Sequence, residues 1–221
     1  RLRATGPREA HVGAPWPLWL PASENVTLRA VEKNWSPLVH EGELYISYSL
    51  EPHIVLRCDW RGGRCTVAHN SSSALLRTYL HLGQEVRGGS PYARVADGYL
   101  GAMHVKDTMH WPPLYATIFY IVDAHPPFRL RSLSPKLCVS ESSVELALSP
   151  TCALQYVVGL VVDEEHGRAL ISYGQLDCEM RLAELPLDPL LALTRTHTVE
   201  VSEHEDEADA VSAELSSSEC V

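Results

Sequence analysis

The sequence predicts an all-β protein and, among the all-β architectures, a partial β-propeller of about three blades. Short runs rich in Val, Ile and Tyr recur along the chain, each bounded by Gly, Pro, Asp or Ser, and helical periodicity is nearly absent. Such runs are typical of the strands of a sandwich, a barrel or a propeller. They cover residues 44–50, 53–58, 99–105, 114–122, 156–162, 169–174 and 179–185.

A repeated segment favours the propeller among these architectures. Three segments share a turn glycine that an apolar strand follows. They are EGELYISY (41–48), DGYLGAMH (97–104) and HGRALISY (166–173). Gly98 follows Gly42 by 56 residues and Gly167 follows Gly98 by 69, which suits four-stranded units with long connections.

The residue six positions after each turn glycine is aromatic or an imidazole. We expect these side chains on the innermost strand of each blade, where they converge on a central channel. They are Tyr48, His104 and Tyr173, and an acid follows soon after each, namely Glu51, Asp107 and Asp177. Such groups suit a sugar, whose hydroxyls need donors and acceptors and whose C–H faces contact rings. The alternative is that the tyrosines only cap a hydrophobic core.

The two ends of the chain differ in composition from the middle. Residues 1–28 are rich in proline and predict a connector or a truncated end, and residues 29–196 form the partial propeller. A short helix is expected from Asp188 to Thr194, with Asp188 as N-cap and Pro189 in the first turn. Residues 197–221 hold eight Asp or Glu and no Lys or Arg, which predicts a disordered acidic tail. Because propellers close with four or more blades, we expect one or two blades upstream of this sequence.

Composition argues against two classes of partner. The chain has 221 residues and a formal net charge of -10, most of which lies in the tail. It has few lysines and no basic block, so a nucleic-acid groove is not expected. No apolar run approaches the length of a membrane span, and the most apolar stretch, residues 154–162, reads as a buried strand.

The cysteines leave two interpretations open. Cys58 and Cys65 flank a tight turn and Cys138 and Cys152 bracket another short loop, so each pair could form a disulfide. Free buried thiols are the alternative. Asn25 and Asn70 begin glycosylation patterns, which favours a secretory or Golgi compartment over the cytoplasm only weakly. No paired CxxC spacing is present, so no metal site is expected.

Four segments resemble, in order and character, those of the β-mannoside phosphorylases and related β-mannosidases. They are EKNWSPLVHEGELYISYSLEPHIVLRCDW (32–60), RGGSPYARVADGYLGAMHV (87–105), YATIFYIVDAHPPFRLRSLSP (115–135) and YVVGLVVDEEHGRALISYGQLDCEMRLAEL (156–185). The resemblance implies about three blades of a five-bladed propeller. It also implies a carbohydrate-active protein that acts on a β-linked oligosaccharide by inverting phosphorolysis or hydrolysis, without a metal or other cofactor.

The resemblance assigns roles to residues on the matching segments. The sugar side comprises Asn34, Tyr48, Gly88, Gly89, Ser90, Tyr173, Asp177 and Glu179. The phosphate side, for inorganic phosphate as a co-substrate, comprises Lys33, Arg87 and His104. The glycine pair lets backbone N–H groups approach a ligand closely, and Ser90 adds a hydroxyl. The family's general-acid Asp precedes its EKNW-like segment, and residues 1–31 contain no match to it, so the catalytic residue has no counterpart here.

Other interpretations remain open at the level of the sequence. The chain is either part of a longer enzyme or a relative that has lost turnover. A glycosyltransferase-like enzyme and a non-catalytic carbohydrate-binding propeller are the rival functions. The residues also have ordinary interpretations: Arg87 can pair with Glu85 or Asp97, the glycine pair can serve a turn, and His104 can be a core histidine.

Overall fold

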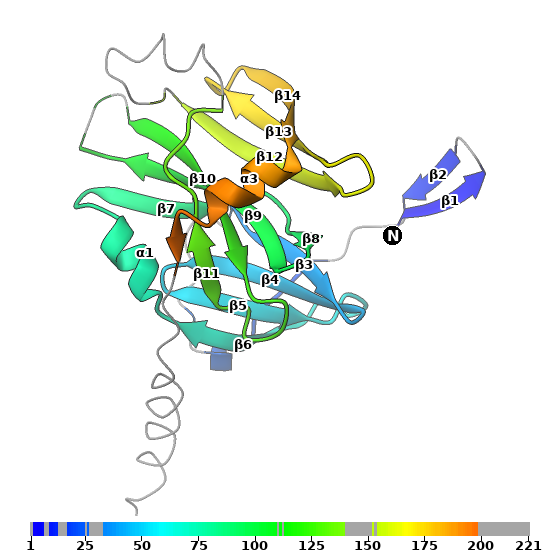
Figure 1. Ribbon diagram of the computed structural model, residues 1–221. Coiled ribbons are helices and arrows are strands. Elements are labelled where there is room, and N and C mark those ends of the chain that lie inside the picture. The colour runs from blue at the N-terminus through cyan, green and yellow to red at the C-terminus, as the bar shows by residue number, and fades with distance from the viewer. Residues whose placement is uncertain are drawn as a thin grey trace, which may run out of the picture.

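The computed structural model describes residues 2–6, 9–12, 17–24, 26, 33–109, 111, 113–139, 152 and 154–198, and they form a mainly β protein (Figure 1). Three antiparallel sheets, here called sheets 1, 2 and 3, follow one another along the chain, except that the last short strand, β15 (His197–Thr198), returns to sheet 2. A separate hairpin of β1 (Leu2–Gly6) and β2 (Glu9–Val12) and a short 3-10 helix (Ala22–Glu24) precede them. The predicted all-β class is therefore confirmed.

Sheet 1 is a simple meander of four strands. Its strands, in spatial order, are β3 (Ser36–His40), β4 (Glu43–Leu50), β5 (His53–Cys58) and β6 (Cys65–Ser71). The β3–β4 turn uses Glu41 and Gly42, both at positive φ, as tight hairpin turns require. Ser73 then caps helix α1 (Ala74–Tyr79) by accepting a hydrogen bond from the Leu76 N–H at 3.2 Å.

Sheet 2 is built around the long strand β9. Its strands are β7 (Gln84–Gly88), β8 (Ala93–Val95), β9 (Gly98–Asp107), β10 (Leu114–Val122), β11 (Leu130–Leu133) and β15 (His197–Thr198). β7 and β8 pair with the same edge of β9 and act as one interrupted first strand. Ser90 spans the interruption, because its Oγ accepts from the Ala102 N–H at 2.9 Å and its own N–H donates to the Ala102 carbonyl at 3.2 Å.

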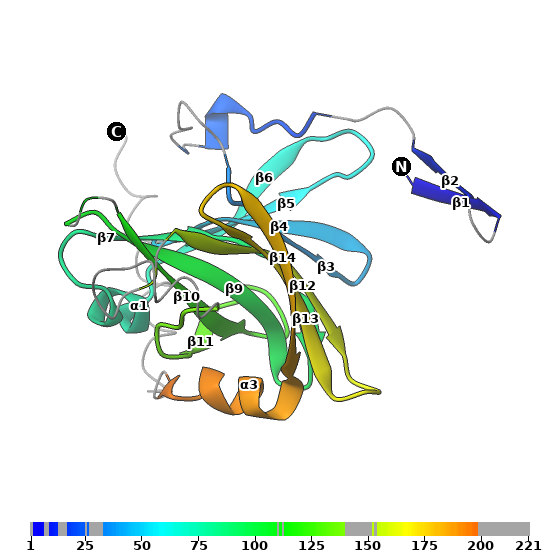
Figure 2. The same ribbon diagram turned by 90° about the horizontal axis from the view of Figure 1, so that it is seen from above.

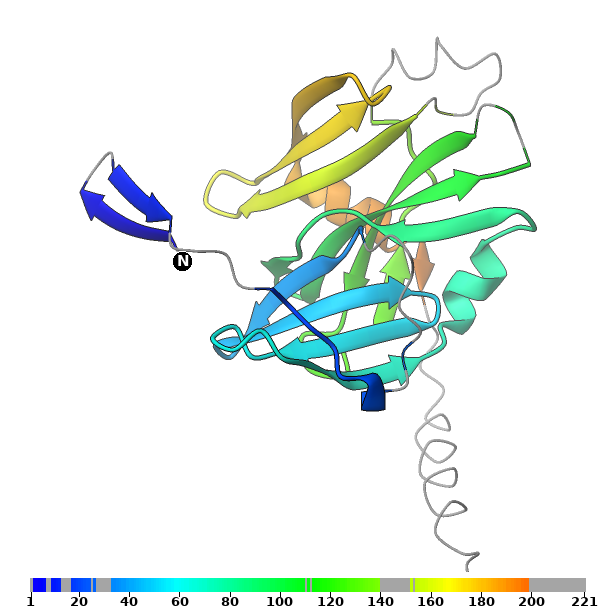
Figure 3. The same cartoon turned by 180° about the vertical axis from the view of Figure 1, so that it is seen from behind.

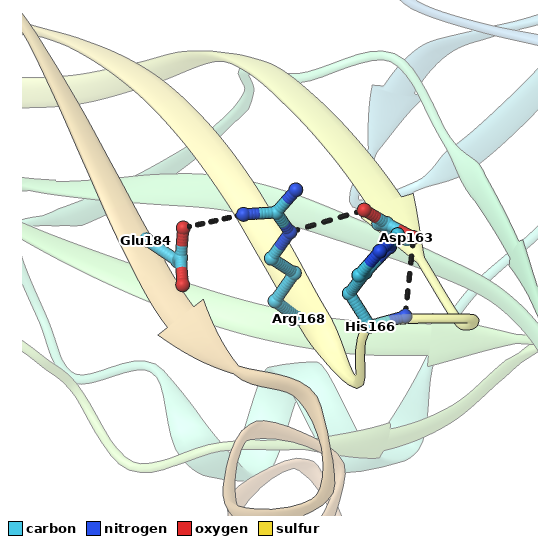
Figure 4. A network of polar contacts seen from close by, with 4 residues as sticks. All are labelled: Asp163, His166, Arg168 and Glu184. Atoms are coloured by element: carbon cyan, nitrogen blue, oxygen red, sulfur yellow. Dashed lines mark hydrogen bonds and ion pairs between the residues drawn. The ribbon is translucent and has the colours of Figure 1, made fainter.

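Sheet 3 has three strands and leads into a helix. It comprises β12 (Gln155–Asp163), β13 (Arg168–Gln175) and β14 (Glu179–Pro186), followed by helix α3 (Leu187–Thr194). The Arg168 side chain contacts both Asp163 and Glu184 at 3.0 Å and so links all three strands, while His166 also contacts Asp163 (Figure 4). The hydrogen bonds from His166 and Arg168 lower the pKa of the Asp163 carboxyl.

The three sheets pack in chain order, with sheet 2 in the middle (Figure 3). One apolar cluster, here the 1–2 cluster, joins sheets 1 and 2 and includes Tyr45, Val55, Met103 and Tyr120. A second, the 2–3 cluster, joins sheets 2 and 3, and α3 closes it from below in Figure 2. A smaller sheet 1 cluster lies on the opposite face of sheet 1, under Leu18 and Leu20. Within the described residues the sheets form an open arrangement and not a closed ring.

The first strands of sheets 2 and 3 and the segment before β3 meet at the Gly88–Gly89 pair. A Cβ added at Gly88 would lie 2.3 Å from the Asn34 carbonyl oxygen, just before β3, and one at Gly89 would lie 2.5 Å from the Val157 carbonyl oxygen, in β12. Only glycine permits the backbones of three sheets to approach this closely. The glycine pair is thus a packing feature of the fold.

The predicted strands and the predicted helix are present, whereas the helix cap and the C-terminal boundary differ from the prediction. All seven predicted runs are strands, namely β4, β5, β9, β10, β12, β13 and β14. The helix before the tail is also present as α3, but Pro186 is its N-cap residue and no side chain caps it, so the predicted Asp188 cap was wrong. His197 and Thr198 pair with β11, so the fold extends two residues past the expected boundary. Residues 199–221, which carry the predicted acidic tail, lie outside the described residues.

Both cysteine pairs that could bridge are disulfides. Cys58 and Cys65 face each other across β5 and β6, with their Cα atoms 4.0 Å apart, and Cys138 bonds Cys152 with a Cα separation of 5.4 Å. Cys178 is a free, exposed thiol. None of the helices in the described part of the chain is long or apolar enough to cross a membrane.

Candidate functional site

Ionisable and aromatic side chains from sheets 2 and 3 gather at one end of β9, and we call this group the His104 site. It contains Lys33, Glu85, Arg87, His104, Tyr115, Tyr156 and Asp177. They come from the segment before β3, from β7, β9, β10 and β12, and from the β13–β14 turn. The residues are distant in sequence, and the close approach of the backbones at Gly88–Gly89 brings these segments together.

His104 is the buried centre of the site. It lies opposite Arg87 on β7 and opposite Thr117 on β10, and its side chain is only 7% exposed. Its Nδ1 and the hydroxyl of Thr117 are buried without a hydrogen-bond partner. Burial, with the Lys33 charge as a second cause, lowers the pKa of His104 to about 4. The imidazole is therefore neutral at pH 7 and adds no positive charge for a phosphate.

Two tyrosine rings flank the imidazole. The ring centroids of Tyr115 and Tyr156 lie 6.0 Å and 6.2 Å from that of His104. Burial and then the Asp177 carboxylate raise the pKa of both tyrosine hydroxyls, so each remains a protonated hydrogen-bond donor at neutral pH. The Tyr156 ring crosses Gly174 so closely that a Cβ there would lie 3.0 Å from it, so this placement needs glycine on β13.

Asp177 reaches the site through a strained turn. The β13–β14 turn places Leu176 at φ 57° and Asp177 at φ 54°, and the Cys178 N–H donates to the Gln175 carbonyl across it at 3.1 Å. A turn with two left-handed residues normally uses Asn and Gly, and a leucine in this conformation costs about 1 kcal/mol. Strain of this kind is concentrated at functional positions, and here it holds an exposed carboxylate beside Tyr156.

The two cations expected on the phosphate side lie at the rim of the site. Arg87 is next to His104 in the sheet and donates to Glu85 at 3.0 Å, so the predicted Arg87–Glu85 pair is present. The Arg87 side chain is 29% exposed, and Lys33 is exposed. Both can still reach an anion, since each keeps further N–H donors.

Neighbouring backbone atoms surround three of the predicted sugar-side residues, so no ligand can reach them. Gly88 and Gly89 face the Asn34 and Val157 carbonyl oxygens, not an open surface that a ligand could reach. Ser90 is completely buried, and its hydroxyl bonds the backbone of β9. Asn34 has φ 65°, is itself half-buried and lies next to the glycine pair. Gly88, Gly89 and Asn34 thus lie where the sheets meet, and Ser90 bridges the interruption between β7 and β8 within sheet 2.

Tyr48, Tyr173 and Glu179 lie outside the His104 site. Tyr48 packs against Trp35 in the sheet 1 cluster, with ring centroids 6.0 Å apart, and Tyr173 is 6% exposed within the 2–3 cluster. Glu179 pairs with Arg181 on the exposed strand β14. The expectation that Tyr48, His104 and Tyr173 stand on innermost strands was wrong, because β4, β9 and β13 are the second strands of their sheets.

Sequence reasoning missed Tyr115 and Tyr156. Tyr115 precedes His104's partner Thr117 by two residues on β10, so strand alternation places it on the same face of sheet 2. That signal was available once the β9–β10 pairing was assumed. Tyr156 had no such signal, since it reaches His104 across the interface of two sheets.

Replacing His104 by phenylalanine tests whether it belongs to a site or only to the core. We expect His104→Phe to fold with no loss of stability at pH 7, because it removes a buried polar atom that lacks a partner and keeps a ring between the tyrosines. Urea unfolding measures this, with His104→Gln as the polar control. A loss of several kcal/mol in His104→Phe alone would show that the imidazole is an essential core group.

Comparison with known proteins gives no family assignment. No protein-family model matches the chain, and no curated protein shows significant similarity to it. Among the described residues, no group of three His, Cys, Asp or Glu side chains is placed to hold a metal ion.

Proposed function

We propose that this chain is a carbohydrate-active protein that binds a β-linked oligosaccharide of the mannoside class at the His104 site. The observation that carries the proposal is the convergence of a neutral imidazole, two tyrosines and an exposed carboxylate from four different segments. A sugar presents hydroxyls that need fixed donors and acceptors and C–H faces that prefer aromatic rings. The site offers both within one small group.

We also propose that sheets 1, 2 and 3 are blades of a propeller. Each of the repeat glycines has a positive φ, and each comes directly before or begins the second strand of its sheet. The first strands of sheets 2 and 3 and the segment before β3 approach one another at Gly88–Gly89. Both features support equivalent sheets arranged around one axis, as the resemblance to the β-mannoside phosphorylases implies.

Turnover is the second candidate function, and the cations favour phosphorolysis. Inverting attack needs a general acid and a nucleophile on opposite faces of the sugar. Burial, and then the carboxylates of Asp177 and Glu85, raise the pKa of Tyr115, so two carboxylates act on this tyrosine, while Arg87 and Lys33 supply positive charge for phosphate. Binding without turnover needs the same aromatic rings, but neither carboxylate then has to act as an acid or a nucleophile.

Titration of the full chain with β-1,4-linked mannobiose distinguishes these functions. We expect saturable binding by calorimetry, a loss of at least tenfold in affinity for Tyr156→Ala, and a smaller loss for Tyr156→Phe, which keeps the ring but not the hydroxyl. Trp60→Ala, which removes an exposed ring on sheet 1, should bind as the unmodified protein does.

Products measured in the same mixtures identify the chemistry. Sugar 1-phosphate formed only with phosphate present indicates phosphorolysis, free mannose indicates hydrolysis, and neither indicates binding alone. If no β-linked manno-oligosaccharide binds, or if Tyr156→Ala binds as well as Trp60→Ala does, the proposal is wrong.

A further inference from the structure

A cavity of about 710 Å³ lies at the opposite end of sheet 2 from the His104 site. Asp97 directly precedes β9 and Asp123 directly follows β10, so both lie at the ends of these strands farthest from His104. His104 follows Gly98 by six positions along β9, which corresponds to about 20 Å. The cavity is therefore a separate surface, and it does not depend on the function proposed above.

Three arginines from two segments of the chain line this cavity. Arg129 directly precedes β11, Arg131 is its second residue, both line the cavity beside the buried Leu130, and Arg195 follows helix α3. Asp123 pairs with Arg131 through Nε, and Asp97 pairs with Arg195 through one terminal nitrogen. The lining thus contains three guanidinium groups and two carboxylates.

The two aspartates position the arginines for an additional ligand. Each ion pair uses one nitrogen of a guanidinium group that has five N–H donors in a planar fork. The remaining donors of Arg131 include both of its terminal nitrogens, the edge that binds carboxylates and phosphates with two parallel hydrogen bonds. A guanidinium fixed by a neighbouring carboxylate also loses less side-chain entropy on binding.

Several contacts fix the loop between β10 and β11, which carries Arg129. Phe128 has φ 57°, which is strained for an aromatic residue, and its ring is completely buried against Tyr45 and Tyr99. His125 lies against His40, and Arg94 donates to the Ala124 carbonyl at 3.2 Å. The loop between β10 and β11 is thus anchored to sheet 1 and to β8; it carries Arg129 and leads directly into β11, which carries Arg131.

We propose that this arginine cavity is a second binding site, for a ligand that carries an oxyanion group such as phosphate or a carboxylate. The oxyanion has two sources. One is a small molecule from solution. The other is the chain itself, because Thr198 lines the cavity and the eight acidic residues of the C-terminal sequence follow it directly. Tethered carboxylates would act at a high effective concentration.

Binding of inorganic phosphate to the full chain tests this site. We expect phosphate to raise Tm by about 4 °C at ten times its dissociation constant, with sodium chloride at equal ionic strength as the reference. Arg129→Gln with Arg131→Gln should abolish the shift, and so should Arg195→Gln, which leaves the loop unchanged. Arg57→Gln, which removes an exposed arginine paired with Glu43 on sheet 1, should keep it.

Neutralising the tail distinguishes the two sources. A full-length variant with Glu203, Glu205, Asp206 and Glu207 changed to the corresponding amides keeps the chain length. If this variant binds phosphate at least fivefold more tightly than the unmodified chain, the tail occupies the cavity. If the two bind alike, the ligand comes from solution. No binding by either protein, or a loss with Arg87→Gln but not with Arg131→Gln, would overturn the proposal.

Discussion

Gly89→Ala is expected to lower the free energy of unfolding by about 3 kcal/mol and to abolish sugar binding at the His104 site. The added Cβ would lie 2.5 Å from the Val157 carbonyl oxygen and 3.0 Å from that of Ala102. Both atoms belong to the backbone of paired strands, so neither can move aside without shifting a sheet. Because Tyr156 adjoins Val157, any such shift also separates its ring from His104.

Gly167→Ala is the matched control for this prediction. Gly167 has φ 62° in the β12–β13 turn, and a Cβ there would meet nothing within 4 Å. Its replacement therefore costs only the left-handed conformation, about 1 kcal/mol, and should leave sugar binding unchanged. Urea unfolding monitored by fluorescence gives both free energies. Equal losses in the two variants would show that the contact of sheets 2 and 3 at Gly89 does not hold the site together.

The repeat glycines show how far the sequence could predict the fold. Gly42, Gly98 and Gly167 were expected in turns before strands, and all three have positive φ. The sequence could not show which strand each turn precedes. Of the three first strands the sequence predicted only β12, whereas β3 contains Pro37 and β7 carries charged residues in a short run, so both are hard to recognise. Without β3 and β7, the strands that follow the glycines were taken as the first strands of their sheets.

The His104 site was predicted in part for a related physical reason. Periodicity within a strand indicates which side chains share a face, and it supports the pairing of Arg87 with His104 once β7 and β9 are aligned. Contacts between sheets depend on where the backbones can approach. Gly88 and Gly89 determine this approach, and a lone glycine pair in a sequence is equally typical of a turn. The role of Tyr156 therefore required the structure.

Two buried histidines are expected to make the protein unfold readily in mild acid. His53 is 3% exposed and its Nε2 lies 2.9 Å from the Ser47 hydroxyl, which in turn contacts the Tyr92 hydroxyl at 2.9 Å. Burial, and then the nearby His69, lowers the pKa of His53 to about 4, the same value as for His104. Between about pH 4 and pH 6.5, both imidazoles are thus neutral in the folded protein but protonated in the unfolded chain.

The sign of the effect follows from proton binding. Between pH 6.5 and 4 the unfolded chain binds more protons than the folded protein, so stability falls as the pH falls through this window and changes no further below it. For a pKa of about 4 against 6.5, each histidine removes about 2 kcal/mol at pH 5 and about 3 kcal/mol at pH 4. Two such losses are comparable with the whole stability of an ordinary domain.

Urea unfolding at pH 7.5, 5.5 and 4.5 measures this dependence. The double variant His53→Gln with His104→Gln replaces both imidazoles by amides that do not titrate, so the loss of stability between pH 7.5 and 4.5 should shrink by about 5 kcal/mol. His81→Gln removes an exposed histidine and should leave the dependence unchanged. An unaltered pH dependence in the double variant would mean that the two imidazoles accept protons in the folded protein. In that case His104 could carry positive charge at the site, and its role toward an anion would have to be reconsidered.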